Sequence, residues 1–182
     1  MDHSYQKFNF SVFLQKYGLF IAFFVLCLIL SIINEHFLSI NNLTNVLRQT
    51  SINGILALGM TFVILSGGID LSVGSILACS GMISASFVAK GSDPNLFLAI
   101  LSAVAVGTLL GSTNGIRISR FKVPPFVATL GMLSAARGLT YIYNDGMPFS
   151  GLSPAFRFLG QGYVFGIPVP VLIFIILSLI SW

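Results

Sequence analysis

The chain has 182 residues, of which 55% are hydrophobic and 8% are charged, and its mean hydropathy is +0.95. A soluble domain of this size cannot bury so large an apolar fraction, so the composition excludes a soluble globular protein and predicts a multi-spanning membrane protein. The net charge of +4 comes from basic residues scattered between apolar runs. This pattern excludes the basic patch that nucleic-acid-binding proteins carry.

Apolar runs along the chain predict an all-α, polytopic transmembrane helical bundle with about six spans on the ~20-residue criterion. Lys7 and Lys16 precede the first run, and basic residues favour the cytoplasmic side, so we expect a cytoplasmic N-terminus. No small-residue cleavage site follows this run, which favours a retained span over a cleaved signal peptide. The predicted spans of this single transmembrane domain (1–182) are residues 17–33, 51–65, 73–88, 96–115, 126–143 and 167–182.

The segments between the spans are polar or rich in Gly and Pro. Residues 37–50 are too polar for a span and predict a short external or interfacial helix. Asp93 and Pro94 suit a helix cap and a first helical position before the next span. Residues 144–166 are expected to lie outside the membrane, where a soluble partner has room to dock. The basic cluster of Arg117, Arg120 and Lys122 predicts a cytoplasmic loop, in agreement with the span count.

One polar break separates two apolar segments at Ser66, Gly67 and Gly68, with Asp70 shortly after. Paired glycines lower helix propensity and permit unusual backbone dihedrals. We expect Asp70 or Ser72 to cap the helix that restarts after them. A non-helical break inside hydrocarbon survives only when it is buried in protein or lines a wet cavity. The pattern therefore indicates either a substrate path or a short turn between two spans.

Two further features of the apolar segments predict packing or function. Small residues that include Gly74, and the spacing of Gly107, Gly111 and Gly115, favour close helix packing. Arg137 lies inside a predicted span, where a guanidinium costs about 2.5–3.5 kcal/mol, so it should face protein, water or a counter-charge unless it snorkels to the surface. Asp70 is the partner that we hypothesise for it.

Two long segments carry a family resemblance. The chain resembles ribose-type sugar ABC transporter permeases in the run Gly59-Met60-Thr61 and in Gly67-Gly68-Ile69-Asp70-Leu71-Ser72-Val73-Gly74-Ser75. It also resembles them in Phe121-Lys122-Val123-Pro124-Pro125-Phe126-Val127-Ala128-Thr129-Leu130-Gly131-Met132, followed by Arg137-Gly138. The resemblance implies the permease subunit of an ATP-binding-cassette importer for ribose or a related monosaccharide, which forms the translocation path in a bacterial inner membrane.

The same resemblance implies partners. They are a periplasmic sugar-binding protein, a second permease subunit that we expect to form a homodimer, and a cytoplasmic ATPase subunit that uses the ATP. The chain itself contains no G-x-x-x-x-G-K-[ST] phosphate loop, so we expect it to bind no ATP or other cofactor and to be no enzyme. Family members are markedly longer, so we expect an N-terminal portion, which need not be active alone.

Neutral polyhydroxy ligands require hydroxyl, amide and aromatic contacts, which makes Ser72, Asn114, Phe126 and Thr129 candidates for lining the path beside Asp70 and Arg137. Asn114 can equally form a hydrogen bond to a neighbouring helix. Two other functions stay open on the residues alone. One is a small membrane scaffold or regulatory protein whose small-residue faces serve association. The other is an ion-coupled secondary transporter in which Asp70 and Arg137 carry protons or ions.

Overall fold

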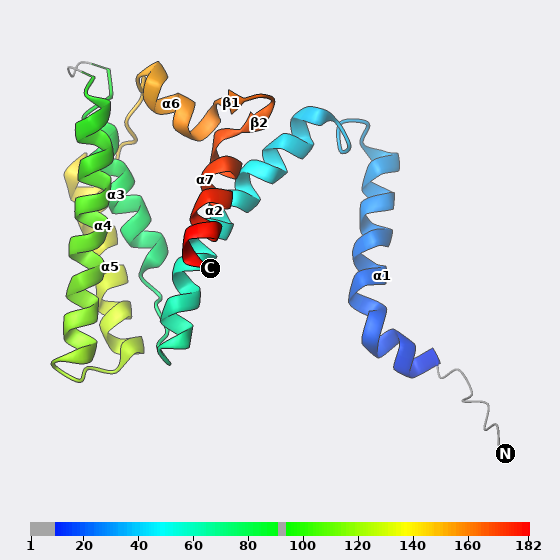
Figure 1. Cartoon of the computed structure of the whole chain (residues 1–182), viewed down its shortest axis with the longest axis horizontal. Helices are drawn as coiled ribbons and strands as arrows, with labels where there is room; N and C mark the ends of the chain where they lie inside the picture. The colour runs from blue at the N-terminus through cyan, green and yellow to red at the C-terminus, as the bar shows by residue number, and fades with distance from the viewer. Residues whose placement is uncertain (1–9, 91–93) are drawn as a thin grey trace. The chain divides into compact units, whose positions relative to one another are not determined.

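The computed structural model describes residues 10–90 and 94–182 (Figure 1). Lys7 and Asp93, named above, lie outside the described residues. The described chain is helical, as the composition predicts, with one short hairpin near its end. Its elements are α1 (Phe10–Ile33), α2 (Ile40–Leu65), α3 (Val73–Ser86), α4 (Leu96–Ser119), α5 (Pro125–Tyr143), α6 (Pro154–Gln161), β1 (Tyr163–Val164), β2 (Ile167–Pro168) and α7 (Val169–Ser181).

The chain divides into two compact units between Val46 and Leu47. The first unit contains α1, whose length and apolar composition are those of a helix that can cross a membrane. After α1 the chain turns, and Ser39 begins the next helix: its Oγ accepts a hydrogen bond from the Asn42 N–H at 3.3 Å. This is the contact of an N-cap residue.

The helix α2 corrects the prediction of a separate interfacial helix at residues 37–50, because Ile40–Leu65 is one helix of 26 residues. Polar side chains stay within it by bonding the preceding turn. Thr44 Oγ1 donates to the Ile40 carbonyl at 2.9 Å, and Ser51 Oγ donates to the Leu47 carbonyl at 2.7 Å. Neither Gly nor Pro interrupts this part of the chain before Gly54. Polarity alone therefore does not end the helix.

In the second unit, α3 packs most extensively against α4 and α5 to form a three-helix bundle (Figure 1). The buried core of this bundle is formed by Cys79, Met132 and Ala136, against which Ile76 and Val106 also pack. Ser84 Oγ donates to the Ala99 carbonyl at 2.7 Å and thereby links α3 to α4. The bundle is the scaffold that holds the polar break.

The helix bounds refine the predicted spans. α4 begins at Leu96, capped by Asn95, and continues to Ser119 rather than residue 115. α7 begins at Val169, after the hairpin. Of the described helices, Phe13–Ile33 and Leu96–Ser119 are long and apolar enough to cross a membrane by themselves, whereas α3 and α7 are apolar but shorter. The count of six spans therefore stays a prediction.

Residues 144–166, which we expect to lie outside the membrane, contain α6 and β1, and the sequence predicts neither element. The strands pair antiparallel, with Phe165 (φ 50°) and Gly166 (φ 80°) in the turn, as in a type I′ hairpin. Arg48 of α2 holds this region, since its Nη2 donates to the Tyr163 hydroxyl at 2.9 Å and to the Gln161 carbonyl at 3.3 Å. This link joins α2 to the end of α6 and to β1.

Candidate functional site

The polar break begins where α2 ends in a Schellman motif. The Gly68 N–H donates to the Val63 carbonyl at 3.0 Å, and the Gly67 N–H donates to the Ile64 carbonyl at 2.9 Å. This pair of bonds satisfies the last carbonyls of the helix when the residue after the cap adopts a left-handed conformation. Gly67 has that conformation, with φ of 76°. The first glycine of the pair therefore ends α2, and the backbone leaves the helix with its polar groups bonded.

The start of α3 is ordered by Asp70. Its Oδ1 accepts hydrogen bonds from the Ser72 N–H at 2.7 Å and from the Ser72 Oγ at 2.6 Å. The helix begins at Val73, as predicted. The Ser72 side chain makes no cap hydrogen bond to the helix. Asp70 thus forms an Asx turn with Ser72, two residues later in the chain, and does not cap the first turn of α3.

A buried polar network connects this turn to α4. Asn114 is 4% exposed and Ser72 is 0% exposed. Asn114 Nδ2 donates to Ser72 Oγ at 2.9 Å, and Ser72 Oγ in turn donates to Asp70 Oδ1. The hydroxyl of Ser72 therefore accepts from one side chain and donates to another. This network fixes the break against α4, about one and a half turns before that helix ends at Ser119.

Thr129 positions α5 beside the same break. Its side chain is buried, and its Oγ1 donates to the Pro125 carbonyl at 2.8 Å, with the Ile69 carbonyl also within reach at 3.3 Å. Pro125 is the first residue of α5, where its missing N–H leaves no unsatisfied donor. The break thus contacts side chains from both neighbouring helices of the bundle.

These elements enclose a cavity of about 450 Å³, which we call the break cavity. It lies within the range of about 300–1,000 Å³ found for small-molecule sites. Four predicted site residues lie at this cavity. Asp70, Asn114 and Thr129 line it. Ser72 is hydrogen-bonded to two of them, Asp70 and Asn114. Phe126 does not join them, because it is 55% exposed and is absent from the lining of this cavity.

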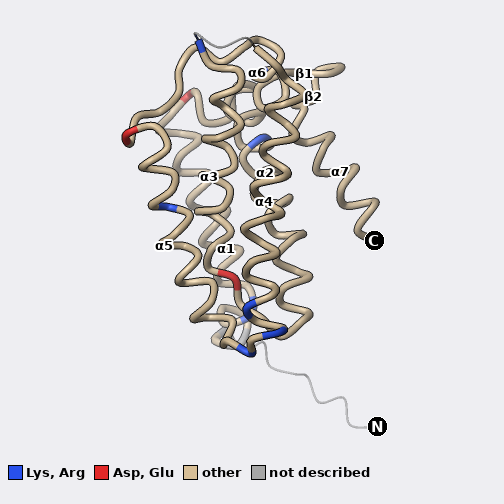
Figure 2. The backbone as a smooth tube through the Cα atoms, turned by 90° about the vertical axis from the view of Figure 1, so that its left-hand side faces the viewer, with Lys and Arg blue, Asp and Glu red and all other residues tan. Residues whose placement is uncertain are grey.

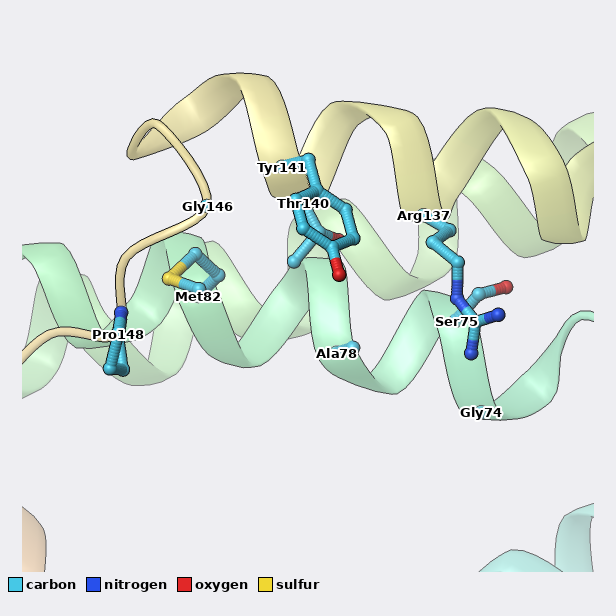
Figure 3. Close-up of a pocket in the computed structure, with 9 residues that line it drawn as sticks. All are labelled: Gly74, Ser75, Ala78, Met82, Arg137, Thr140, Tyr141, Gly146 and Pro148. Atoms are coloured by element: carbon cyan, nitrogen blue, oxygen red, sulfur yellow. The ribbon is translucent and has the colours of Figure 1, made fainter.

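Arg137 lines a second, smaller hollow of about 280 Å³ between α3 and α5, which we call the Arg137 groove. Figure 3 shows its side chain extending from α5 toward Ser75 on α3, with Thr140 and Tyr141 along the same helix. The hypothesised contact with Asp70 is not formed, since no ion pair within 4.0 Å joins these two described residues. The carboxylate of Asp70 instead accepts the two hydrogen bonds from Ser72.

The predicted packing glycines have open surroundings in the described chain. A Cβ added at Gly74, Gly107, Gly111 or Gly115 would meet no heavy atom within 4 Å. Gly111 and Gly115 line the break cavity, and Gly74 lines the Arg137 groove. No element of the described chain packs closely against these glycines. Close helix packing there stays a prediction, and it would have to involve other segments or another subunit. At Gly68, in the break, an added Cβ would lie 3.4 Å from Val63 Cγ1.

The sequence reading missed three features of the site. The sequence predicts only a packing role for Gly111 and Gly115 and gives no prediction for Tyr141, although each lines one of the two hollows. The contact of Asn114 with Ser72 joins residues that are 42 positions apart, which no local pattern encodes. The spacing of Asn114 one turn from Gly111 was the available signal, because both side-chain positions lie near one face of α4.

Known proteins that the chain resembles are permease components of transport systems. Residues 42–182 match a family model described as "Branched-chain amino acid transport system / permease component". The ribose import permease RbsC of Haemophilus influenzae is 45% identical over 100% of this chain and 57% of its own length. The Bacillus subtilis RbsC is 45% identical, over 97% of this chain and 55% of its own length. The Escherichia coli D-allose permease AlsC is 41% identical, over 97% and 54%.

The chain spans about half the length of the curated relatives that it matches. No solved structure matches it. The resemblance carried by the break motif is confirmed by these relatives, and the family consists of multi-pass inner-membrane transport components rather than enzymes. Since the family model covers residues 42–182, the chain belongs to the family described as "Branched-chain amino acid transport system / permease component".

Proposed function

We propose that the chain belongs to the membrane-spanning subunit of an ATP-binding-cassette importer for ribose or a related monosaccharide. The observation that carries this proposal is the 45% identity to ribose import permeases, which extends over 97–100% of the chain. The similar proteins named for other sugars, such as D-allose and xylose, support a sugar substrate rather than the branched-chain amino acids in the family's description.

The substrate path passes the break cavity and involves Asp70, Ser72, Asn114 and Thr129. Two observations support this choice. The break is non-helical backbone beside apolar helices, and such backbone is stable at membrane depth only in protein or against a wet cavity. The cavity combines apolar walls with a few polar side chains, as small-molecule sites do. Phe126 and Arg137 belong to the path only if it extends beyond this cavity.

The N-terminus and the loop between α4 and α5 face the cytoplasm in this proposal. Figure 2 shows Lys and Arg gathered at the end of the bundle where α4 leads into α5. Basic residues favour the cytoplasmic side. Arg117, Arg120 and Lys122 lie in this part of the sequence, so the break cavity lies toward the cytoplasmic end of the bundle.

Three partners complete the proposed importer. A cytoplasmic ATPase subunit uses the ATP, a periplasmic sugar-binding protein delivers the sugar, and a second copy of the permease forms a homodimer. Gly107 of α4, which lines neither the break cavity nor the Arg137 groove, supports a helix contact with that second copy, because small residues let membrane helices approach closely.

Uptake in cells tests the proposed function. Deleting the gene that encodes this chain should abolish binding-protein-dependent uptake of radiolabelled D-ribose, and restoring the gene should recover it. Competition for uptake by excess D-allose or D-xylose would extend the substrate range to these sugars. Inhibition by leucine with no effect of any sugar would contradict the proposal, and so would unchanged D-ribose uptake in the deletion strain that contains no other D-ribose importer.

A further inference from the structure

The break cavity contains unused hydrogen-bond acceptors. Asn114 lines the cavity and is 4% exposed, yet its Oδ1 is buried without a hydrogen-bond partner among the described residues. Asp70, on the opposite side of Ser72 in the network, uses only its Oδ1. Its Oδ2 has no partner in the described part of the chain. Buried polar groups are nearly always paired, so the orphaned Oδ1 of Asn114 requires an explanation, whereas Asp70 is only half-buried.

The orientation of the Asn114 amide follows from counting protons. The hydroxyl of Ser72 has a single proton, and an ionised carboxylate only accepts. The bond of 2.6 Å between Ser72 Oγ and Asp70 Oδ1 therefore uses that proton. The second partner of Ser72 must be a donor, which only the Nδ2 of Asn114 can be. Exchanging the two ends of the amide would not pair Oδ1, because it would place two acceptors together.

The donors around this cavity are mostly occupied. Thr129 Oγ1 donates to the Pro125 carbonyl, and Ser66 Oγ donates to the Val63 carbonyl at 2.7 Å. Asn114 Nδ2 is bonded to Ser72. Two side-chain protons of the lining stay unused in the described chain: the second proton of Asn114 Nδ2 and the hydroxyl proton of the exposed Ser119. The unused side-chain groups of the cavity are therefore two acceptors, Asn114 Oδ1 and Asp70 Oδ2, together with these two donor protons.

We propose that the break cavity is a binding site for a neutral polyol, whose neighbouring hydroxyl groups donate to Asn114 Oδ1 and Asp70 Oδ2. The proposal rests on the proposed function and assigns the sugar to this cavity rather than to the Arg137 groove. A hydroxyl group both donates and accepts, so the several hydroxyls of a polyol suit a site with two unused acceptors and free donor protons. An anionic ligand is excluded, because it would face the carboxylate of Asp70.

A bound metal ion explains the acceptors less well. Hard cations such as Ca²⁺ take six to eight oxygen ligands. The cavity lining contributes one carboxylate, and the described chain contains no group of three or more His, Cys, Asp or Glu that could hold a metal. The volume of about 450 Å³ is also much larger than a single ion requires.

Cysteine protection tests this site independently of transport. Gly111 and Gly115 line the cavity, whereas Gly131 lies on α5 outside it, and a Cβ at each would meet nothing within 4 Å. Gly111→Cys, Gly115→Cys and the control Gly131→Cys are made in the complete permease with Cys27 replaced by Ser. The native Cys79 is buried and needs no change. The rate of modification by N-ethylmaleimide is measured in membranes with and without D-ribose.

We expect D-ribose to slow modification of G111C and G115C at least fivefold and to leave G131C unchanged. Equal rates with and without D-ribose at both cavity positions, or no modification there at all, would overturn the polyol site. Protection by sodium ions instead of D-ribose would overturn it in favour of a cation. Uptake by the unmutated permease separates the two proposals: uptake without protection removes only the polyol site, whereas absent uptake removes both.

Discussion

The break cavity and the Arg137 groove both lie beside the first turn of α3, but their polar side chains are held in different ways. In the break cavity, Asp70, Ser72 and Asn114 are bonded to one another and two of the three are buried. In the groove, the exposed guanidinium of Arg137 has no hydrogen bond or ion pair within the described chain. One site is preorganised and the other is not.

This difference also divides their chemistry. The break cavity contains two unpaired acceptors, on Asn114 and Asp70, whereas the groove offers the donors of Arg137 and Tyr141. The network side chains contribute to folding as well as to any ligand contact. The groove side chains contribute to folding little. Substitutions should therefore separate the two regions by their effect on stability.

The largest effect is expected for Ser72→Ala. The substitution leaves the buried Nδ2 of Asn114 without an acceptor and removes one donor from Asp70, at a cost of about 2–4 kcal/mol of unfolding free energy. Thermal unfolding of the detergent-solubilised protein measures it. Ser75→Ala is the matched control, because its buried hydroxyl only donates to the Ser72 carbonyl at 2.8 Å. Equal losses in the two variants would show that the network contributes no special stability.

A double-mutant cycle sharpens the same point. Asn114→Ala removes the donor and also the orphaned Oδ1, so it should cost less than Ser72→Ala. Interhelical hydrogen bonds in membranes have coupling energies of about 0.6 kcal/mol on average and about 1.7 kcal/mol at most. We expect the Ser72→Ala and Asn114→Ala losses to be coupled within this range. Strictly additive losses would mean that the 2.9 Å contact does not connect the break to α4 energetically.

The paired glycines allow a comparison between adjacent positions. Gly67→Ala places a Cβ on a residue with φ of 76° and should cost about 1–2 kcal/mol. Gly68→Ala should cost about 0.5 kcal/mol or less, as an unstrained surface change does, because its φ is not in the left-handed region and its Cβ would meet Val63 at an ordinary 3.4 Å. Thermal unfolding again measures both. The opposite ranking would contradict a Schellman end at Gly67.

Local patterns in the sequence were sufficient for the break and for most helix ends. Val73 begins α3, as the restart after the glycine break predicts, although Ser72 makes no cap hydrogen bond, and α5 begins at Pro125, one residue before the predicted span 126–143. The continuity of α2 was not predictable by the same rules, since its polar residues were interpreted as a boundary. Their hydroxyl groups bond the preceding turn instead. The start of α6 had a recognisable signal that was overlooked: Ser153 caps it and Pro154 is its first residue.

The residues of the break cavity were predicted as candidates, but their arrangement was not. Rare charges in apolar surroundings suggested a pair of Asp70 and Arg137. The serine two residues after Asp70 offers two donors at almost no cost in chain entropy, so the local turn prevails over the distant ion pair. Which side chain of α4 reaches Ser72 depends on helix packing, and that depends on the bundle as a whole.

The smallest effect on stability is expected at Arg137. Arg137→Gln should change the unfolding free energy by about 0.5 kcal/mol or less, because an exposed guanidinium without a partner in the described chain has no contact to lose. Removing a charge that costs about 2.5–3.5 kcal/mol to insert should not impair membrane insertion. D-ribose uptake then decides the role of the groove. If the path extends along it, uptake falls about tenfold, as expected for a lost hydrogen bond to a charged group, and Arg137→Lys recovers part of the loss. Unchanged uptake in both variants would confine the path to the break cavity, whereas a loss of stability above about 1 kcal/mol would mean that Arg137 has a structural partner in another subunit or segment.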